Sequence, residues 1–207
     1  SRLLCGSLGI LGLITEVSIK VLPLPKQEVT LRLPMSAPEA LAAFNGWRRQ
    51  PLPISAGSWA EGSTTVRLSG APAALAAARA RIGGEPLADA EASTWWESLR
   101  HQTHPFFMSA AALWRVWVPA TTPLMAILGP QVMEWSGALR WHATDLPPAE
   151  VRRLATAASG SAMQWRGAPE GDMFHPLSPP ILALHRKLKD RFDPRGIFNP
   201  GRLVADL

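Results

Sequence analysis

Three glycines spaced three residues apart near the start of the chain could bind a phosphate group. Gly6, Gly9 and Gly12 come directly before an apolar, β-branched run, and Ser7 follows the first of them. Glycine permits positive φ and a close approach to the main chain, so a glycine loop that meets a strand can offer backbone N–H groups to a phosphate. The spacing is not the G-x-G-x-x-G of a dinucleotide-binding loop. Packing beside a buried strand is the alternative explanation, and the glycines alone do not decide between the two.

The five histidines offer two further candidates for chemistry. His101 and His104 form an H-x-x-H pair that could hold a metal from one helix face, but no third ligand of matching type lies nearby and Pro105 follows at once. We therefore expect these imidazoles to cap helix ends, and we predict no metal site. His175, in the stretch 172–176, is the second candidate.

Composition describes a globular protein of 207 residues that is 47% hydrophobic and 18% charged. The net charge of +5 comes from 21 basic and 16 acidic residues, and the basic residues are scattered rather than interleaved with aromatic ones. A nucleic-acid partner is therefore not expected. The longest uncharged stretch, residues 116–133, contains three prolines, so we expect no transmembrane segment. A single cysteine, Cys5, excludes an internal disulfide framework and is typical of a reducing cytoplasm.

Periodicity predicts the elements that must position these residues. Strands are expected at 14–22, 28–33, 54–59 and 64–68, and helices at 36–49 and 71–82, with Ser36 as N-cap and Glu39 three residues later. This order is the front of a ferredoxin-like unit, an α+β fold in which an antiparallel sheet carries helices on one face. A further helix is expected at 94–101.

The second half of the chain repeats the same order of elements. Strands are expected at 113–118, 138–143 and 161–166, and helices at 123–128, 148–158 and 179–192. Nine tryptophans and no tyrosine are distributed over the chain, and Trp114 and Trp117 should lie on opposite faces of their strand. We expect most of these indoles in the core, and an aromatic surface at a subunit interface is the alternative.

Motifs at both ends of the chain resemble FAD-linked oxidases of the vanillyl-alcohol-oxidase type. They are GSLGILGLITEVSIKVLPLP at 6–25 and LKDRFDPRGIFNPGRL at 188–203. The stretches between them are similar to the FAD-binding E subunits of bacterial glycolate oxidases, and these are WWESLRHQTHPFF, LWRVWVPATTP, EWSGALRW and FHPLSPP. The resemblance covers nearly the whole chain. In that family a sizeable flavin-binding segment precedes the part matched here, so the resemblance implies a C-terminal portion.

The resemblance also implies a domain organisation and a set of flavin contacts. Residues 1–25 would end the FAD-binding domain, residues 26–190 would form the ferredoxin-like cap domain, and residues 191–207 would return to the flavin. Gly6, Ser7 and Gly9 would line the pyrophosphate, and the backbone from Gly12 to Ile14 would lie near the adenine. Asn199 would approach the isoalloxazine, although an asparagine before a proline is also a common turn residue.

The implied activity is oxidation of a short 2-hydroxy acid through FAD. The implied partners are a catalytic flavin subunit and an iron–sulfur subunit, in the cytoplasm or peripherally at the inner membrane. His175 matches a shortened form of a histidine motif that lies near the substrate in catalytic members of the superfamily, so a catalytic role for it is one expectation. The companion histidine-rich segments are absent, so this chain by itself is expected to be inactive. A non-catalytic assembly subunit and an independent FAD-linked oxidase are the alternatives.

Overall fold

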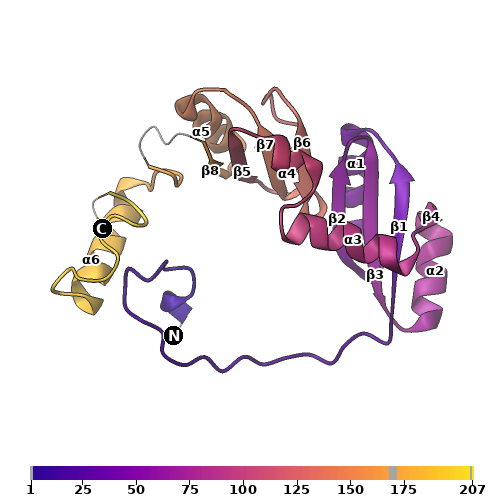
Figure 1. Cartoon of the computed structure of the whole chain (residues 1–207), viewed down its shortest axis with the longest axis horizontal. Helices are drawn as coiled ribbons and strands as arrows, with labels where there is room; N and C mark the ends of the chain where they lie inside the picture. The colour runs from indigo at the N-terminus through magenta and orange to yellow at the C-terminus, as the bar shows by residue number, and fades with distance from the viewer. Residues whose placement is uncertain (1, 168–171, 206) are drawn as a thin grey trace. The chain divides into compact units, whose positions relative to one another are not determined.

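The computed structural model describes residues 2–167, 172–205 and 207, and the chain divides into two compact units (Figure 1). One unit consists of Ser1–Leu22 together with Pro169–Leu207, and the other of Pro23–Ala168. The smaller unit therefore combines the two ends of the chain. Its regular elements are η1 (Arg2–Leu4) and α6 (Pro179–Phe192).

The larger unit is built on one open sheet of eight strands in the order β4-β1-β3-β2-β6-β7-β5-β8, with every pair antiparallel. The strands are β1 (Gln27–Pro34), β2 (Ile54–Ala60), β3 (Ser63–Gly70), β4 (Glu85–Pro86), β5 (Leu113–Trp117), β6 (Gln131–Glu134), β7 (Leu139–Ala143) and β8 (Ser161–Arg166). The helices are α1 (Ala37–Arg48), α2 (Pro72–Ile82), α3 (Asp89–Arg100), α4 (Pro105–Ser109) and α5 (Pro148–Ala157), with the 3-10 turn η2 (Trp135–Gly137).

The sheet consists of two similar halves that meet where β2 pairs with β6. In the first half β1 lies between β4 and β3, and in the second half β5 lies between β8 and β7, so both halves have the ferredoxin-like strand order. Only two residue pairs join them, Trp59 with Met133 and Ala60 with Val132. The predicted α+β class and the repeated order of elements are confirmed.

Alternation along β1 decides which side chains meet which helices. Leu31 and Leu33 point into a core shared with α1 and α2, where Leu41 and Phe44 of α1 are also buried, as predicted. The N-terminus of α1 is fixed by the predicted capping box, because the backbone N–H of Ser36 donates to the Glu39 carboxylate at 2.8 Å. This half is therefore specified by local signals that agree with the tertiary fold.

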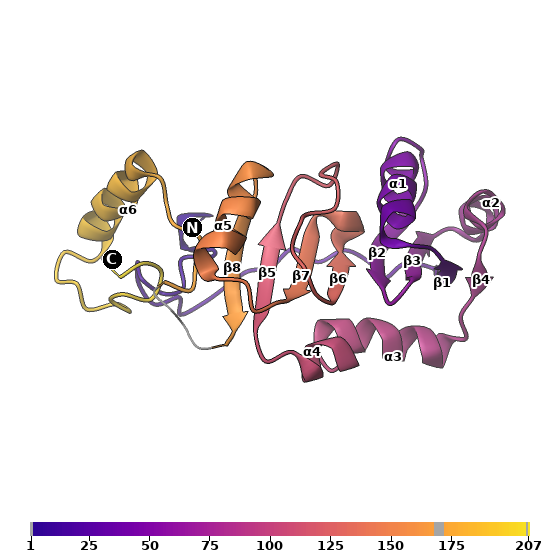
Figure 2. The same cartoon turned by 90° about the horizontal axis from the view of Figure 1, so that it is seen from above.

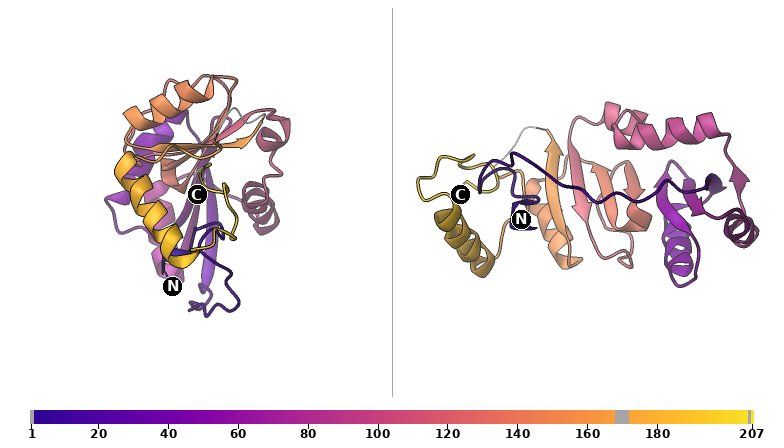
Figure 3. Two further views of the ribbon diagram at one scale, coloured as in Figure 1. Left: turned by 90° about the vertical axis from the view of Figure 1, so that its left-hand side faces the viewer. Right: turned by 90° about the horizontal axis from the view of Figure 1, so that it is seen from below.

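The second face of the sheet is covered as well. Trp96 of α3 donates its indole N–H to Thr30 of β1 at 3.0 Å, and Trp95 donates to Ser58 of β2 at 3.1 Å. Figure 2 and the right-hand view of Figure 3 show α3 and α4 along the face opposite α1 and α5. The helix was predicted from residue 94, but it begins at Asp89, after an Ala88 N-cap that carries no side-chain signal.

Tryptophans pack on both faces of the second half. Trp114 is 1% exposed in the cluster with α5, whereas Trp117 lies in the cluster on the other face with Trp141. The predicted opposite orientation of Trp114 and Trp117 is thereby confirmed, as is the prediction that most indoles are packed. Trp135 and Trp165 are the exceptions, at 58% and 40% exposed.

Two predicted elements are wrong. Residues 14–22 form no strand, and their large side chains are exposed, with Val21 80% exposed. Within the described residues no other strand pairs with this segment, and a strand requires a partner for its backbone N–H and C=O groups. It leads instead, as irregular chain, from one unit to the other.

The predicted helix at 123–128 is also absent, because a buried arginine binds the carbonyls that would begin it. Arg140 of β7 is fully buried and donates to the carbonyl of Pro123 at 2.6 Å and to that of Thr122. It also donates to Gly137 at 3.1 Å. These carbonyls point toward a guanidinium rather than along a helix axis. The second half therefore has a loop where the first half has α1.

Candidate functional site

The candidate site is the junction between the glycine loop and the asparagine turn, both in the smaller unit. Leu8 and Gly9 have φ of 53° and 77°, so the loop uses two successive residues in the left-handed region. Asn199 also lies there, at φ 41°. Its amide Nδ2 donates to the carbonyl of Leu8 at 2.8 Å. Residues that are 191 positions apart in sequence are thus in contact.

Gly9 is required at this contact for a steric reason. A Cβ added to Gly9 would lie 2.7 Å from Nδ2 of Asn199, closer than real Cβ contacts allow. The positive φ would strain any other residue as well. The structure therefore brings the predicted site residues Gly9 and Asn199 together. The contact also explains why residue 9 is a glycine without reference to any ligand.

A buried lysine holds the two ends of the chain together. Lys189 of α6 is 7% exposed, and its ammonium donates to three acceptors. They are the carbonyl of Ile10 at 2.7 Å, the carbonyl of Phe198 at 2.6 Å and the carboxylate of Asp193 at 2.7 Å. Three donors thus meet three acceptors, one of which comes from the glycine-loop end and two from the tail. A fully paired ammonium is the condition under which a lysine tolerates burial.

Asp193 organises the turn that presents Asn199. Its carboxylate accepts the N–H of Ile197 at 3.1 Å and the N–H of Phe198 at 2.8 Å, besides the Lys189 ammonium. Burial acts to raise the pKa of Asp193, but the hydrogen bonds from Lys189 and from the two amides outweigh it and hold the pKa at about 2. The carboxylate is therefore ionised at neutral pH, as its three donors require.

An apolar cluster supports the same junction. Ile10 and Leu11 are buried against Leu207, with Leu182 and Leu188 of α6 packed on them. The junction thus combines a small hydrophobic core with one buried ion pair.

Sequence reasoning missed both Lys189 and Asp193. The signal in the sequence was an i,i+4 Lys–Asp pair at the end of a helix, which normally indicates an exposed ion pair. Only the tail folding back against the glycine loop buries it.

The other predicted flavin contacts lie in the same loop or next to it. Ser7 donates its hydroxyl to the carbonyl of Leu4 at 2.9 Å and its N–H to the same carbonyl at 3.3 Å, so both donors serve the loop itself. Gly6 and Gly12 have nothing within 4 Å of an added Cβ, which leaves open space beside the main chain. Ile14 is 47% exposed in the irregular segment that follows.

The histidines fall into two groups. His175 is half-buried in the irregular segment before α6, and the hydrogen bonds that join Leu8 to Asn199 and Lys189 to Ile10 do not involve it. His104 is the N-cap of α4, where its Nδ1 accepts the N–H of Phe106 at 3.3 Å, and His101 is the C-cap of α3. The capping prediction is confirmed for the imidazole of His104, whereas His101 ends α3 through its backbone N–H. No group of three metal-ligating side chains was found in the described part of the chain.

Among the described residues, no helix has the length and apolar character needed to cross a bilayer. No protein-family model matches the chain. Over all 207 residues the chain is 40% identical to glycolate oxidase subunit GlcE of Escherichia coli K12, and it spans 57% of the length of that protein. The resemblance expected from the stretches between the end motifs is thus confirmed, and all 207 residues of the chain are similar to glycolate oxidase subunit GlcE.

Proposed function

We propose that this chain is part of an FAD-binding subunit of a glycolate-oxidase-like complex, which oxidises a short 2-hydroxy acid. The observation that carries the proposal is the identity of 40% over all 207 residues to a protein named as a glycolate oxidase subunit. An identity of this size without gaps in coverage supports a shared fold and a related role. The contact between the glycine loop and the asparagine turn supports the same reading from the structure.

The glycine loop has features that suit a nucleotide cofactor. Gly6 has φ of 80° and open space where a side chain would stand, so a phosphate could approach its main chain. Nδ2 of Asn199 donates to the carbonyl of Leu8, and Oδ1 of the same amide could accept a hydrogen bond from a ring N–H without adding charge. FAD, when bound, supplies the two-electron acceptor for the hydroxy acid. The role of this chain is to hold and orient the cofactor through Gly6, Gly9 and Asn199.

The described residues form only part of such a site. The glycine loop offers main-chain donors for phosphates, but Ser7 uses its donors within the loop. We therefore expect the 207-residue chain by itself to bind FAD weakly or not at all. A catalytic role for His175, as base or substrate ligand, stays a prediction.

The proposed partners are a catalytic flavin subunit and an iron–sulfur subunit that passes the electrons on. Reconstitution of the natural full-length protein with and without these partners tests the proposal, and the two readouts are FAD bound per polypeptide and glycolate-dependent dye reduction. FAD binding without turnover in isolation, and turnover in the complex, is the expected result. Turnover in isolation would indicate an independent oxidase. Absence of FAD in the full-length protein would refute the proposal and favour a non-catalytic assembly subunit.

A pair of variants refines this experiment. Asn199→Ala removes the amide of the asparagine turn and should lower the FAD content of the full-length protein. Lys187→Ala, an exposed position on the same region of chain, is the matched control and should not change it. Equal FAD content in both variants would show that Asn199 has no part in holding the cofactor.

A further inference from the structure

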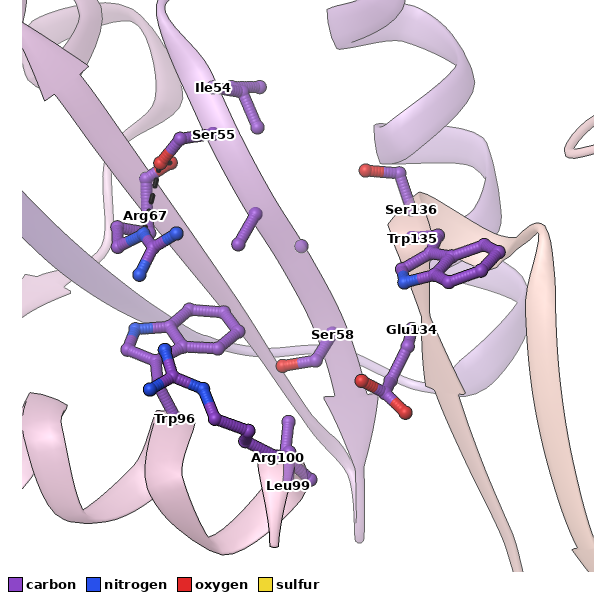
Figure 4. A pocket seen from close by; sticks show the side chains of 12 residues that line it. Ile54, Ser55, Ser58, Arg67, Trp96, Leu99, Arg100, Glu134, Trp135 and Ser136 are labelled. Carbon is purple, nitrogen blue, oxygen red and sulfur yellow. Dashed lines mark hydrogen bonds between the residues drawn. The ribbon is translucent and has the colours of Figure 1, made fainter. Parts of the chain in front are cut away.

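A groove on the α3 face of the larger unit has the features of a ligand site. It lies where β2 meets β6 and has a volume of about 590 Å³. Its walls come from four separate parts of the chain, namely β2, β3, α3 and the segment 134–136 (Figure 4). A volume of several hundred Å³ is typical of sites for small organic ligands and much larger than a two-carbon acid needs.

One wall carries two guanidinium groups beside an indole. Arg67 is fixed by Nε, which donates to Ser55 at 3.0 Å, and its guanidinium lies 5.6 Å from the centre of the Trp96 ring. Arg100, at the end of α3, has no hydrogen-bond or ion-pair partner among the described residues. Figure 4 shows both guanidinium groups next to Trp96. Arg67 also lies 3.6 Å from the carboxylate of Glu28. The charge on this wall that no partner among the described residues offsets is therefore that of Arg100.

The opposite wall carries a half-buried carboxyl group and an exposed indole. Glu134 accepts the indole N–H of Trp141 at 2.6 Å. Burial raises the pKa of Glu134, opposed by the Trp141 hydrogen bond and by the charge of Arg115. Figure 4 shows Glu134 and Trp135 across the groove from Arg67 and Trp96, with Ser58 between the walls. Two arginines thus face this carboxyl group across the groove. Because Arg67 is also paired with Glu28 outside the lining, Arg100 supplies the uncompensated positive charge.

Trp135 is held at the groove in a strained conformation. Trp135 and Ser136 have φ of 51° and 52°, a region that bulky L-residues rarely adopt. The surroundings hold them there, since Arg48 donates to the Ser136 carbonyl at 3.3 Å. Ser136 also packs closely against Gly57, because a Cβ added to Gly57 would lie only 2.8 Å from Ser136 Oγ. Strained residues of this kind concentrate at functional sites.

The geometry points to a binding site for a monocarboxylate with an aromatic body, held by Arg67 and Arg100 at its charged end and by Trp96 and Trp135 along its ring. The two arginines supply hydrogen-bond donors for one carboxylate, and the indole faces supply planar contact area. The size of the groove and its two indoles favour an aromatic body over a simple short-chain acid. The inference does not depend on FAD or on the proposed oxidation.

Calorimetric titrations of the full-length protein with three ligands test the charged end and the aromatic ring separately. Phenylacetate has both the charge and the ring, acetate has the charge alone, and 2-phenylethanol has the ring alone. Phenylacetate should bind at least about tenfold more tightly than either of the others, and more weakly as the salt concentration rises. Equal affinity for acetate, or no binding of phenylacetate, would overturn the proposal.

Variants place the binding in the groove. Arg100→Gln and Trp135→Leu should each weaken phenylacetate binding by about tenfold or more, because one removes a charged donor and the other a ring contact. Arg81→Gln, exposed on α2, is the control of equal charge change and should leave the affinity unchanged. Since Arg100 has no hydrogen-bond or ion-pair partner within residues 2–167, 172–205 and 207, its replacement should not alter the thermal unfolding midpoint. Unchanged affinity in both groove variants would refute the site.

Discussion

Replacing His142 with leucine should remove most of the acid sensitivity of the larger unit between pH 6.5 and 4. His142 lies in β7 and is 1% exposed, and neither of its ring nitrogens has a hydrogen-bond partner in the part of the chain that the structure describes. Burial, and secondarily the positive charge of nearby Arg140, lowers its pKa to about 4. The imidazole is therefore neutral in the folded protein at neutral pH.

The sign and size of the effect follow from linkage. The pKa of an unfolded histidine is about 6.5, so between pH 6.5 and 4 the unfolded chain binds more protons than the folded one. The neutral His142 ring therefore makes its full contribution to the free energy of unfolding above about pH 6.5, and this contribution is lost as the pH falls toward 4. A gap of roughly 2.5 between the two pKa values corresponds to about 3 kcal/mol, of which about 2 kcal/mol is lost by pH 5.

Urea unfolding followed by tryptophan fluorescence measures this loss in the right part of the molecule. All nine tryptophans lie in the larger unit, so the signal does not report on the smaller one. His142→Leu breaks no hydrogen bond, and its free energy of unfolding at neutral pH should stay within about 1 kcal/mol of the natural protein. At about pH 5 the variant should be the more stable by about 2 kcal/mol.

A matched control and a clear contrary result accompany this measurement. His101→Leu changes an exposed histidine at the end of α3 and should leave the pH dependence of unfolding unchanged. If the natural protein and His142→Leu lose stability in parallel between neutral pH and pH 5, the buried imidazole carries no protonation cost. That result would refute the lowered pKa of His142.

Three further predictions concern the smaller unit. Lys189→Met should accelerate hydrogen exchange of the tail amides in the full-length protein, because the buried carboxylate of Asp193 loses its cation. Lys187→Met is the control and should not change the exchange. Equal exchange rates in the two variants would contradict the buried ion pair. Because the pKa of Asp193 is lowered to about 2, the contribution of its carboxylate to the stability of the smaller unit should be complete above about pH 4 and should disappear as the pH falls through 2. Hydrogen exchange of the tail amides measured at a series of pH values would detect this loss. A loss of protection already at pH 5 would contradict the lowered pKa. Gly9→Ala should expel Asn199 from its contact and destabilise the junction by about 1–2 kcal/mol, and unchanged protection of the tail would refute the steric argument.

Local signals in the sequence were sufficient for most of the larger unit. The capping box at Ser36, the alternation of Leu31 and Leu33 and the proline-bounded helices all predicted elements that the structure contains. In these segments the preference of the chain and the demands of the core agree, so neighbouring residues are enough to specify them. The end motifs likewise indicated that Gly9 and Asn199 belong to one site.

Interactions between distant residues decided what the sequence could not show. Residues 14–22 could form a strand only next to a partner strand. Residues 123–128 form no helix because Arg140, in β7, binds the carbonyl of Pro123, the first of them. The same holds for Lys189, whose sequence neighbours are typical of an exposed helix end but whose ammonium is buried by Ile10. Sequence alone determined which segments could form helices and strands, while burial and long-range hydrogen bonds determined which of them did and where charged groups lie. The physical reason is that a backbone preference is local, whereas the cost of an unpaired buried donor or charge depends on every group that the fold brings near it.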